Sequence, residues 1–494
     1  MARIESRFLT PKVCKMNRRD FLRSAGALTA GLACPLATAK QLKNGGARKG
    51  SRPNFLFIFA DDLGYGDLGC YGHPYARTPH LDGLASEGTL FKHAYVTGQT
   101  CCPSRTGLMT GLYPARFERY MSDYGFGDRI TITELLKNAG YHTGHVGKWH
   151  IGPEEKPGTY GLDWTPETSS TTRGSVSERE KGRDGYVFDQ AIEFLEQADD
   201  RPFYLNVWGH ISHFPVDPHE KFVKRFENVT VDESRFSAPM REKFDQCREL
   251  GGNVNEGMRK YLGDVSSLDD NVGRLLKKLD ELGLRDNTVV VFASDQGPAP
   301  VILGPKGAPT DNRKPERRIF ARNMLGSMQP FRGGKHTFLE GGVHTPFIIR
   351  WPDKVPAGRV NDTSVISMID WLPTISRLAG IENIPGGLDG EDVSDIWLGA
   401  TRTRTTPLFW RLSSRRTQTV VRDGNWKYFA PATSRIPAEL YDVSKDIMEA
   451  HNVADERPDI VRRLQKLADA FEAELPARYV KGNRKRLKKQ DKNK

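Results

Sequence analysis

Four short runs of almost uninterrupted apolar residues constrain the fold of this chain more than any other feature. The runs are Phe55 to Ala60, Tyr204 to Val207, Thr288 to Ala293 and Phe347 to Ile349. Such continuous runs are typical of strands that are buried on both faces of a parallel sheet. Helical patterns separate them, the clearest from Tyr261 to Leu282, where apolar residues recur at three- and four-residue spacings. The alternation predicts an α/β fold with a large, mostly parallel sheet between layers of helices.

Polar residues follow four predicted strands at the point where each strand ends. One of these is a further apparent strand from Tyr141 to Val146. The four polar groups are Asp61 with Asp62, Lys148 with His150, His210 with His213, and Asp295 with Gln296. Ligands of parallel sheets bind beyond the carboxyl ends of the strands, so we expect these side chains to lie near one another. A role as helix caps or turn residues would explain one such group, but it would have to be invoked separately for each of the four.

Oxygen ligands dominate two of these groups. Asp61, Asp62 and Asp295 offer carboxylates, and Gln296 adds an amide oxygen. Adjacent carboxylates in a water-poor site repel one another unless a cation neutralises them. Asp61 and Asp62 alone would fit a solvated turn equally well, but the four residues together predict a metal site. An all-oxygen set favours Ca²⁺, with Mg²⁺ as the alternative, over zinc.

The pentapeptide Cys101-Cys102-Pro103-Ser104-Arg105 lies between the first two polar groups. A helix from Ser104 to Thr110 would place Cys101 at its positive end, where an anion is favoured. Arg105 and Lys148 could neutralise negative charge there. Lys335 could do the same, because Gly333-Gly334 allows the backbone to come close. A lone lysine or arginine is otherwise most often a surface residue.

The formal net charge of +11 belongs to the two ends of the chain. Residues 1–52 and 481–494 carry a large excess of Lys and Arg, which leaves the body with a net negative charge. We therefore expect no nucleic-acid partner. Residues 481–494 contain a single large apolar side chain, Leu487, and are predicted to be a basic, disordered tail.

The N-terminal charge precedes a short apolar stretch. Asn17 to Arg23 contains a twin arginine, and Ala25 to Ala37 leads into the small residues Ala37-Thr38-Ala39. This pattern resembles a twin-arginine export signal, so we predict a signal peptide over residues 1–39, a linker over 40–52, and a periplasmic or secreted protein. The stretch is too short for a permanent membrane anchor. Lipid attachment at Cys34 is disfavoured because the residues before it fit a lipobox poorly.

The pattern changes after about residue 400. Thr419 to Phe429 reads as two strands joined by an Asp-Gly turn, and Ile460 to Leu475 reads as an amphipathic helix. We therefore divide the body into a catalytic domain at 53–400 and a smaller α+β domain at 401–480.

Taken together, the body resembles the type I sulfatases, which are formylglycine-dependent enzymes of the alkaline-phosphatase superfamily. The pattern is most similar to arylsulfatases and N-acetylgalactosamine-6-sulfatases, over nearly all of residues 53–480. The matching segments are Phe59 to Asp62, Cys101 to Gly107, Gly147 to Gly152, His213 to Pro215, Ser294 to Gly297, and Arg332 to Lys335 followed by Glu340 to Gly342.

The resemblance implies an activity, namely hydrolysis of sulfate esters of a carbohydrate or an aryl alcohol. A formylglycine-generating machinery would oxidise Cys101 to formylglycine, which hydrates to a geminal diol. One hydroxyl would attack sulfur with Asp295 as base, while His213 and Lys335 protonate the leaving oxygen. His150 would then deprotonate the second hydroxyl and expel sulfate. In this scheme Arg105 and Lys148 hold the nucleophile and the charge, and Cys101 in its modified form also contacts the metal.

Two positions depart from the family pattern. Gln296 stands where Asn or His is more usual, and His344 stands where Glu-Gly-Gly-x-Arg is usual. We keep His210 and His344 as candidate substrate-binding residues, although a structural, hydrogen-bonded role fits His210 somewhat better. The basic segment from Gln296 to Lys335 would suit a sulfated polymer if it borders the site, or it is a solvated surface loop. Two other functions stay open: a formylglycine-dependent phosphonate or phosphodiester hydrolase, and a catalytically silent glycan-binding homologue.

Overall fold

A computed structural model describes residues 52–119, 121–152, 156–166, 180–302, 314–411, 418–432, 436–477 and 479. The predicted signal peptide, nearly all of the linker and the predicted basic tail lie outside these residues, so they stay predictions. The same holds for Lys306 and Arg313 of the basic segment.

A seven-stranded sheet forms the centre of the described chain, in the order β4-β5-β1-β6-β7-β2-β8. Strands β4, β5, β1 and β6 are parallel, and β7 is antiparallel to both of its neighbours. The bounds are β1 Asn54–Asp61, β2 Thr89–Phe91, β4 His142–Gly147, β5 Phe203–Ser212, β6 Thr288–Ser294, β7 Phe347–Arg350 and β8 Arg359–Asn361. The predicted sheet is confirmed. Strand β5 extends to Ser212, five residues beyond Val207, where the predicted apolar run ends.

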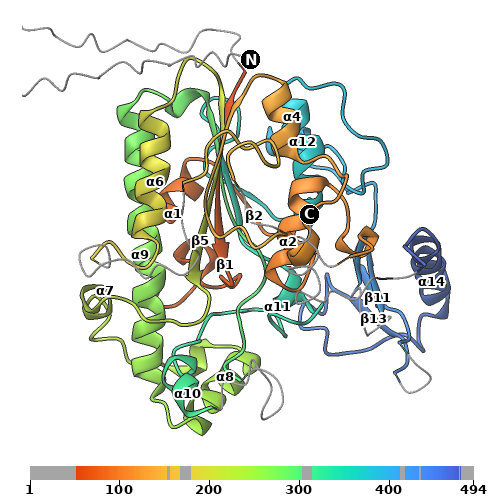
Figure 1. Cartoon of the computed structure of the whole chain (residues 1–494). Helices are drawn as coiled ribbons and strands as arrows, with labels where there is room; N and C mark the ends of the chain where they lie inside the picture. The colour runs from red at the N-terminus through yellow and green to blue at the C-terminus, as the bar shows by residue number, and fades with distance from the viewer. Residues whose placement is uncertain are drawn as a thin grey trace, which may run out of the picture. The chain divides into compact units, whose positions relative to one another are not determined.

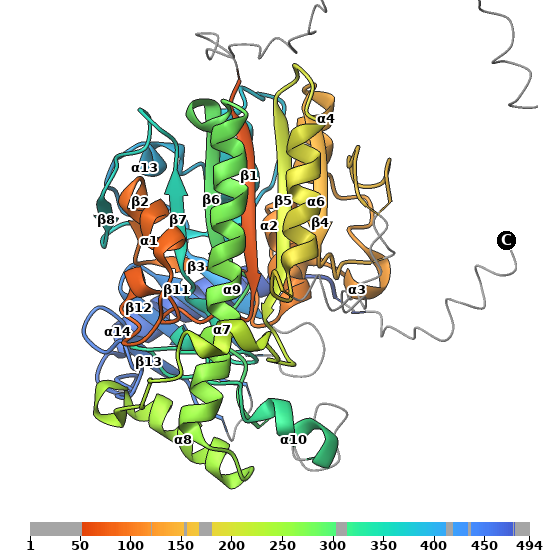
Figure 2. The same ribbon diagram turned by 90° about the vertical axis from the view of Figure 1, so that its left-hand side faces the viewer.

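Helices cover both faces of this sheet (Figure 1). One layer consists of α1 (Pro79–Ser86), α6 (Gly185–Glu196) and α9 (Val254–Glu281). The other consists of α2 (Cys101–Thr110), α4 (Ile132–Asn138) and α12 (Trp371–Leu378). Figure 2 shows α9 and α6 lying along the strands on their side of the sheet. Helix α9 begins seven residues before the predicted start at Tyr261, because Asn253 caps it by accepting a hydrogen bond from the Glu256 N–H.

Strand β1 divides the hydrophobic core into two halves. Side chains of a strand alternate between its faces. Phe55, Phe57 and Phe59 therefore pack in the cluster on the α2 side, whereas Leu56 and Ile58 pack in the cluster on the α9 side. Both faces are buried, which explains why the sequence of β1 is continuously apolar rather than alternating.

The C-terminal residues form a second, antiparallel sheet. It contains β10 (Leu408–Arg411), β11 (Thr419–Asp423), β12 (Trp426–Phe429) and β13 (Glu439–Asp442), and α14 (Pro458–Ala473) packs against β11. Gly424 has a φ of 60° in the β11–β12 turn, as the Asp-Gly signal predicts. The predicted hairpin, helix and α+β character are thus confirmed.

Shorter elements complete the described chain. The short strands and helices are β3 Ala94–Tyr95, β9 Ile366–Ser367, α3 Met121–Tyr124, α7 Glu220–Lys224, α8 Ala238–Glu249, α10 Pro315–Ala321, α11 Glu340–Val343 and α13 Ser394–Trp397. Helix α10 corrects the interpretation of residues 296–335 as one long loop. Its start fits Pro315 at the first helical position. Among the described residues, no helix is both long enough and apolar enough to cross a membrane.

We expect Phe57→Ala to lower the free energy of unfolding by about 3–5 kcal/mol, because it opens a cavity in the core. Phe57 is fully buried, and its ring lies 4.3 Å from that of Trp371. Urea denaturation followed by circular dichroism measures the change. Ile319→Ala, at a side chain that is 58% exposed, is the control and should change it by no more than about 0.5 kcal/mol. A loss below about 1 kcal/mol for Phe57→Ala would contradict this account of the core.

Candidate active site

Two neighbouring parallel strands bring three carboxylates to one edge of the sheet. Asp61 ends β1, and Asp62 follows it with a φ of 63°, a conformation that non-glycine residues adopt rarely. Asp295 follows β6, and its Oδ1 accepts a hydrogen bond of 3.1 Å from the Asp62 N–H. All three side chains are buried. The strand ends therefore meet as the sequence predicts.

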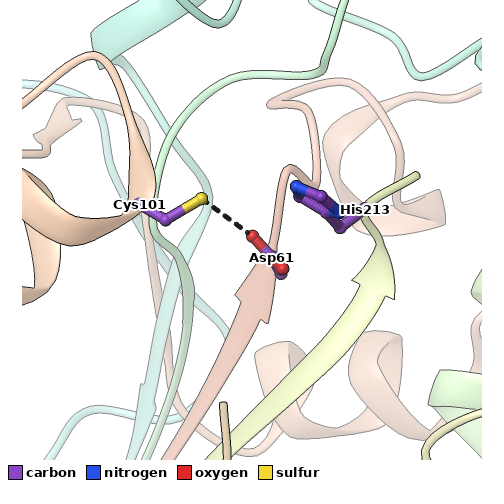
Figure 3. Close-up of side chains that lie close together, drawn as sticks. All are labelled: Asp61, Cys101 and His213. Carbon is purple, nitrogen blue, oxygen red and sulfur yellow. Dashed lines mark hydrogen bonds between the residues drawn. The ribbon is translucent and has the colours of Figure 1, made fainter. Parts of the chain in front are cut away.

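Cys101 lies against these carboxylates as the first residue of α2. The helix thus begins at Cys101 itself, three residues before the predicted start at Ser104. Cys101 Sγ lies 3.3 Å from Asp61 Oδ1, 3.2 Å from Gln296 Nε2 and 3.3 Å from Lys148 Nζ. In Figure 3, Cys101 and His213 point toward Asp61 from α2 and from the end of β5. The positive helix end faces the three carboxylates.

Arg105 lies one helical turn after Cys101 and points to the same site. Its Nε and Nη2 donate hydrogen bonds of 3.0 and 2.7 Å to Asp295 Oδ2, and its Nη1 donates to the Lys148 carbonyl oxygen at 2.6 Å. The guanidinium carbon lies 5.0 Å from the ring centroid of Trp208. Arg105 is fully buried. It therefore fixes both Asp295 and the backbone that carries Lys148.

Two lysines complete the cationic side of the site. Lys148 Nζ lies 2.5 Å from Asp61 Oδ2, and Lys335 Nζ lies 2.7 Å from Asp62 Oδ1 and 3.6 Å from Cys101 Sγ. Burial alone would lower the pKa of Lys335, but Asp62, Cys101 and Asp61 together outweigh it and hold that pKa above its ordinary value. Gly147 lets the backbone turn so that Lys148 enters the site. Its φ is 91°, and a Cβ there would lie 2.0 Å from the Trp208 carbonyl oxygen, so a side chain at this position would clash.

The predicted histidines take different places around the site. His213 Nδ1 donates to the Phe214 carbonyl oxygen at 2.8 Å, which leaves Nε2 facing the site, 3.9 Å from Asp62 Oδ2. His150 is exposed and has a φ of 62°. Although His150 is in contact with solvent, surrounding protein atoms partly bury its ring. This burial, together with the Lys148 cation, lowers the pKa of His150 to about 4. An imidazole that is neutral at physiological pH can accept a proton.

Cys101 is a poor nucleophile as a thiol in this environment. Burial raises the pKa of the thiol, and the Asp61 carboxylate raises it further. A thiolate is the reactive form of cysteine, so these surroundings suppress ordinary thiol chemistry. The surroundings instead suit an oxygen group at the position of Sγ, where it would meet the lysines and the carboxylates.

The donor set fits a hard divalent cation. Ligand atoms of Asp61, Asp62, Asp295 and Cys101 all lie within 4.8 Å of one another. Gln296 is fully buried, and its Oε1 has no hydrogen-bond partner in the part of the chain that the structure describes. An unpaired buried carbonyl oxygen is costly, and a cation among these carboxylates would satisfy it.

Two further histidines were candidates for substrate binding. His210 Nδ1 lies 3.2 Å from Asp184 Oδ1, and its side chain is 24% exposed. Its binding role stays a prediction. The expectation for His344 is corrected: it is 1% exposed, Nδ1 lies 3.0 Å from Glu340 Oε2, and Nε2 contacts the Lys92 carbonyl oxygen. Because both ring nitrogens have protein partners, the ring offers no atom to a substrate.

The structure also reveals site residues that sequence reasoning missed. Asp184 is fully buried and accepts hydrogen bonds from the backbone N–H groups of His210 and Ile211, which fixes the end of β5. His336 is exposed directly after Lys335, with a φ of 77°. The signal for His336 was its place beside a lysine in a glycine-rich segment. Asp184 had no comparable signal, because its partners are distant in sequence.

Comparison with known proteins decides the family. The model of the sulfatase family matches residues 53–381, and that of the N-sulphoglucosamine sulphohydrolase C-terminal domain matches residues 334–474. The chain belongs to the sulfatase family. It is a sulfuric ester hydrolase by this membership. Its fold of a mostly parallel sheet with a C-terminal antiparallel sheet is shared with solved structures.

Relatives of this sulfatase span nearly its whole length. Human arylsulfatase A is 30% identical over 87% of this chain and 89% of its own. The N-acetylgalactosamine-6-O-sulfatase of Bacteroides thetaiotaomicron is 27% identical over 90% of this chain and 98% of its own. Among solved structures, Ps i-CgsB in complex with k-i-k-neocarrahexaose has a TM-score of 0.66 and 24% identity, covering 85% of this chain and 93% of its own.

We expect Arg105→Met to lower the free energy of unfolding by about 3 kcal/mol, because it strips Asp295 of its bidentate partner inside a dry site. Urea denaturation measures the loss. The control is Arg201→Met, which breaks the exposed pair with Asp199 and should change stability by less than about 1 kcal/mol. Equal effects of the two substitutions would show that Arg105 does not compensate the buried carboxylates.

Proposed function

We propose that this sulfatase removes sulfate from a sulfated carbohydrate, with formylglycine made from Cys101 as the nucleophile. The observation that carries the proposal is the position of Cys101 Sγ, within 3.6 Å of Lys148 Nζ, Lys335 Nζ, Asp61 Oδ1 and Gln296 Nε2. An oxygen there would face cations and metal-type ligands at the positive end of α2. Hydrated formylglycine supplies two hydroxyls, one to attack sulfur and one to release sulfate.

Asp61, Asp62, Asp295 and Gln296 would hold a divalent cation, for which Ca²⁺ suits the all-oxygen set and Mg²⁺ is the alternative. The ion would supply positive charge next to the position of Cys101 Sγ. The buried Gln296 Oε1 supports this assignment, since it has no partner among the described residues. Gln296 is one methylene longer than the more usual Asn, but it keeps an amide oxygen that can bind the metal.

The other side chains of the site either transfer protons or neutralise charge. Asp295 is placed to accept a proton from the attacking hydroxyl, and burial raises the pKa of this carboxyl to about 6, closer to the range of a general base. Lys148 and Arg105 neutralise charge at the nucleophile. His213 in its imidazolium form, with a proton on Nε2, would protonate the leaving oxygen together with the Lys335 ammonium beside it.

His150 acts in the second half of the reaction. It follows the lysine that contacts Cys101 Sγ, and its ring is neutral at physiological pH. A neutral imidazole can take the proton of the second hydroxyl and so expel sulfate. A serine at position 101 would provide only one hydroxyl, so the bound sulfate could not be released by this route.

The surroundings of His213 favour an anionic carbohydrate. Helix α10 packs on the next residue, Phe214: the ring of Phe320 lies 6.2 Å from its ring, and the guanidinium carbon of Arg317 lies 4.6 Å from its centroid. The same helix carries Arg318, which is exposed. The basic side chain of Arg317 thus lies beside the residue that follows His213, where it would favour further sulfate groups of a polymer. The carbohydrate names of the relatives support the same class.

Export and maturation fit together in this proposal. The twin-arginine pathway moves folded proteins, whereas formylglycine formation needs an accessible chain. We infer that Cys101 is oxidised in the cytoplasm, before export by the signal at residues 1–39. The mature protein is then periplasmic or secreted.

We expect the peptide that contains position 101 to have the mass of an aldehyde in active protein, and Cys101→Ala to lower kcat by at least about 1000-fold, as loss of a covalent nucleophile does. Mass spectrometry and hydrolysis of an aryl sulfate measure these effects. Cys102→Ala is the matched control and should keep both the aldehyde and most of the activity. An active exported protein with an unmodified Cys101 thiol would refute the proposal.

The alternative enzyme class is separable by substrate. Aryl sulfate, aryl phosphodiester and aryl phosphonate are offered to the same preparation, and we expect kcat/KM to be highest for the sulfate ester by at least about 10-fold, because sulfate matches the family chemistry. A preference for either phosphorus ester would identify a phosphonate or phosphodiester hydrolase. Binding of sulfated glycans without any hydrolysis would instead identify a silent glycan-binding protein.

Metal binding is testable without activity. We expect Ca²⁺ to raise the thermal midpoint of the wild type, because an ion that binds only the folded state stabilises it, and we expect Asp62→Asn to lose most of that rise. Differential scanning fluorimetry with Ca²⁺ or Mg²⁺ measures both. Asp232→Asn, at an exposed carboxylate, should leave the rise unchanged. Equal rises for wild type and Asp62→Asn would remove Asp62 from the site.

A further inference from the structure

A buried group of charges joins the C-terminal sheet to the segment that carries Lys335. Lys427 on β12 places Nζ 2.8 Å from Glu340 Oε1 and 3.0 Å from Glu449 Oε1. The three side chains are at most 2% exposed. Ionised groups lose their hydration at such depth, so each depends closely on the positions of the other two.

Residues 448–449 hold the segment from Arg332 to Glu340 at both ends. At one end, Arg332 Nε and Nη2 donate to the carbonyl oxygens of Met448 and Glu449 at 3.1 and 2.6 Å. At the other end, the Glu340 N–H donates to Glu449 Oε2 at 2.7 Å. The Gly341 N–H donates to the Arg332 carbonyl oxygen at 2.9 Å and closes the segment on itself.

The closed segment has little freedom where it meets the active site. The Lys335 N–H donates to the Pro298 carbonyl oxygen at 3.1 Å, and the Gly297 N–H donates to the Gly342 carbonyl oxygen at 3.0 Å. A Cβ on Gly297 would lie 1.7 Å from the Gly341 carbonyl oxygen, so the two backbones are in direct contact. A shift of Glu340 would therefore reach Lys335.

We propose that Lys427 and Glu449 are positioning residues of this sulfatase: acting through Glu340, they hold the Lys335 ammonium beside Asp62 and Cys101. The C-terminal part of the chain is then part of the catalytic machinery, although neither Lys427 nor Glu449 touches the reacting atoms. This inference rests on the proposed function, in which Lys335 acts at the leaving oxygen. Displacement of a catalytic group by about 1 Å can cost about 100-fold in rate.

The test is a double-mutant cycle with the full-length, formylglycine-containing enzyme and an aryl sulfate. We expect Lys427→Met, which keeps length and removes charge, to lower kcat by about 10- to 100-fold with KM changed by less than about twofold. In a Lys335→Ala background the same change should cost less than about twofold, because the group that it positions is already gone. Lys427→Arg should recover part of the activity.

A second buried ion pair is the matched control. Arg404 Nη2 lies 2.7 Å from Asp370 Oδ1, and the other partner of Arg404, the Thr406 carbonyl oxygen, also lies outside residues 332–344. Arg404→Met should lower the thermal midpoint as Lys427→Met does, yet leave kcat/KM of the folded enzyme within about twofold. An equal loss of kcat for Arg404→Met would show that Lys427 contributes stability alone.

The other outcomes are also decisive. The positioning role is overturned if the losses of kcat caused by Lys427→Met and Lys335→Ala are fully additive, or if Lys427→Met keeps the wild-type kcat. Either result leaves the proposed function intact. Wild-type activity of Lys335→Ala refutes the role of Lys335 itself and the positioning with it. If Lys427→Met does not fold, Glu449→Gln, which keeps the shape of the side chain, enters the same cycle with the same expectations.

Discussion

The balance of buried opposite charges at the carboxyl edge of the sheet is the constraint on which the rest of this structure depends. Three carboxylates, of Asp61, Asp62 and Asp295, meet three cations, of Arg105, Lys148 and Lys335, in a site almost closed to water. Such charges are tolerable only when every one has a partner at close range. Each contributing segment must therefore end at a defined place.

The architecture meets this demand with rigid elements. Parallel β1 and β6 fix the carboxylates, α2 presents Cys101 and Arg105 one turn apart, and glycines admit the two lysines. Asp62, His150 and His336 have positive φ angles, and the bend at Asp62 lies where its carboxylate enters the site. Strain of this kind persists only where the surrounding packing determines it, and it is common at sites of catalysis.

Sequence reasoning predicted the sheet, and it predicted that the residues of the candidate site lie near one another, because these features have local signals. Continuous apolar runs identify buried strands, and polar residues directly after them identify the edge where they meet. The environment of His344 has no local signal in the sequence. It is made by Lys92 and Glu340, and only the folded chain brings Lys92 near His344. The early start of α9 was missed because Asn253 precedes the apolar pattern rather than belonging to it.

The sequence by itself determined the class of fold, the order of the functional residues and the resemblance to sulfatases, because periodicity and short motifs are properties of neighbouring residues. Only the tertiary structure decided which charges pair, which histidines face the site and how the C-terminal sheet reaches Lys335 through Lys427 and Glu340. The physical reason is that pairing energies depend on distance and burial. Both quantities exist only once segments far apart in the chain have packed together.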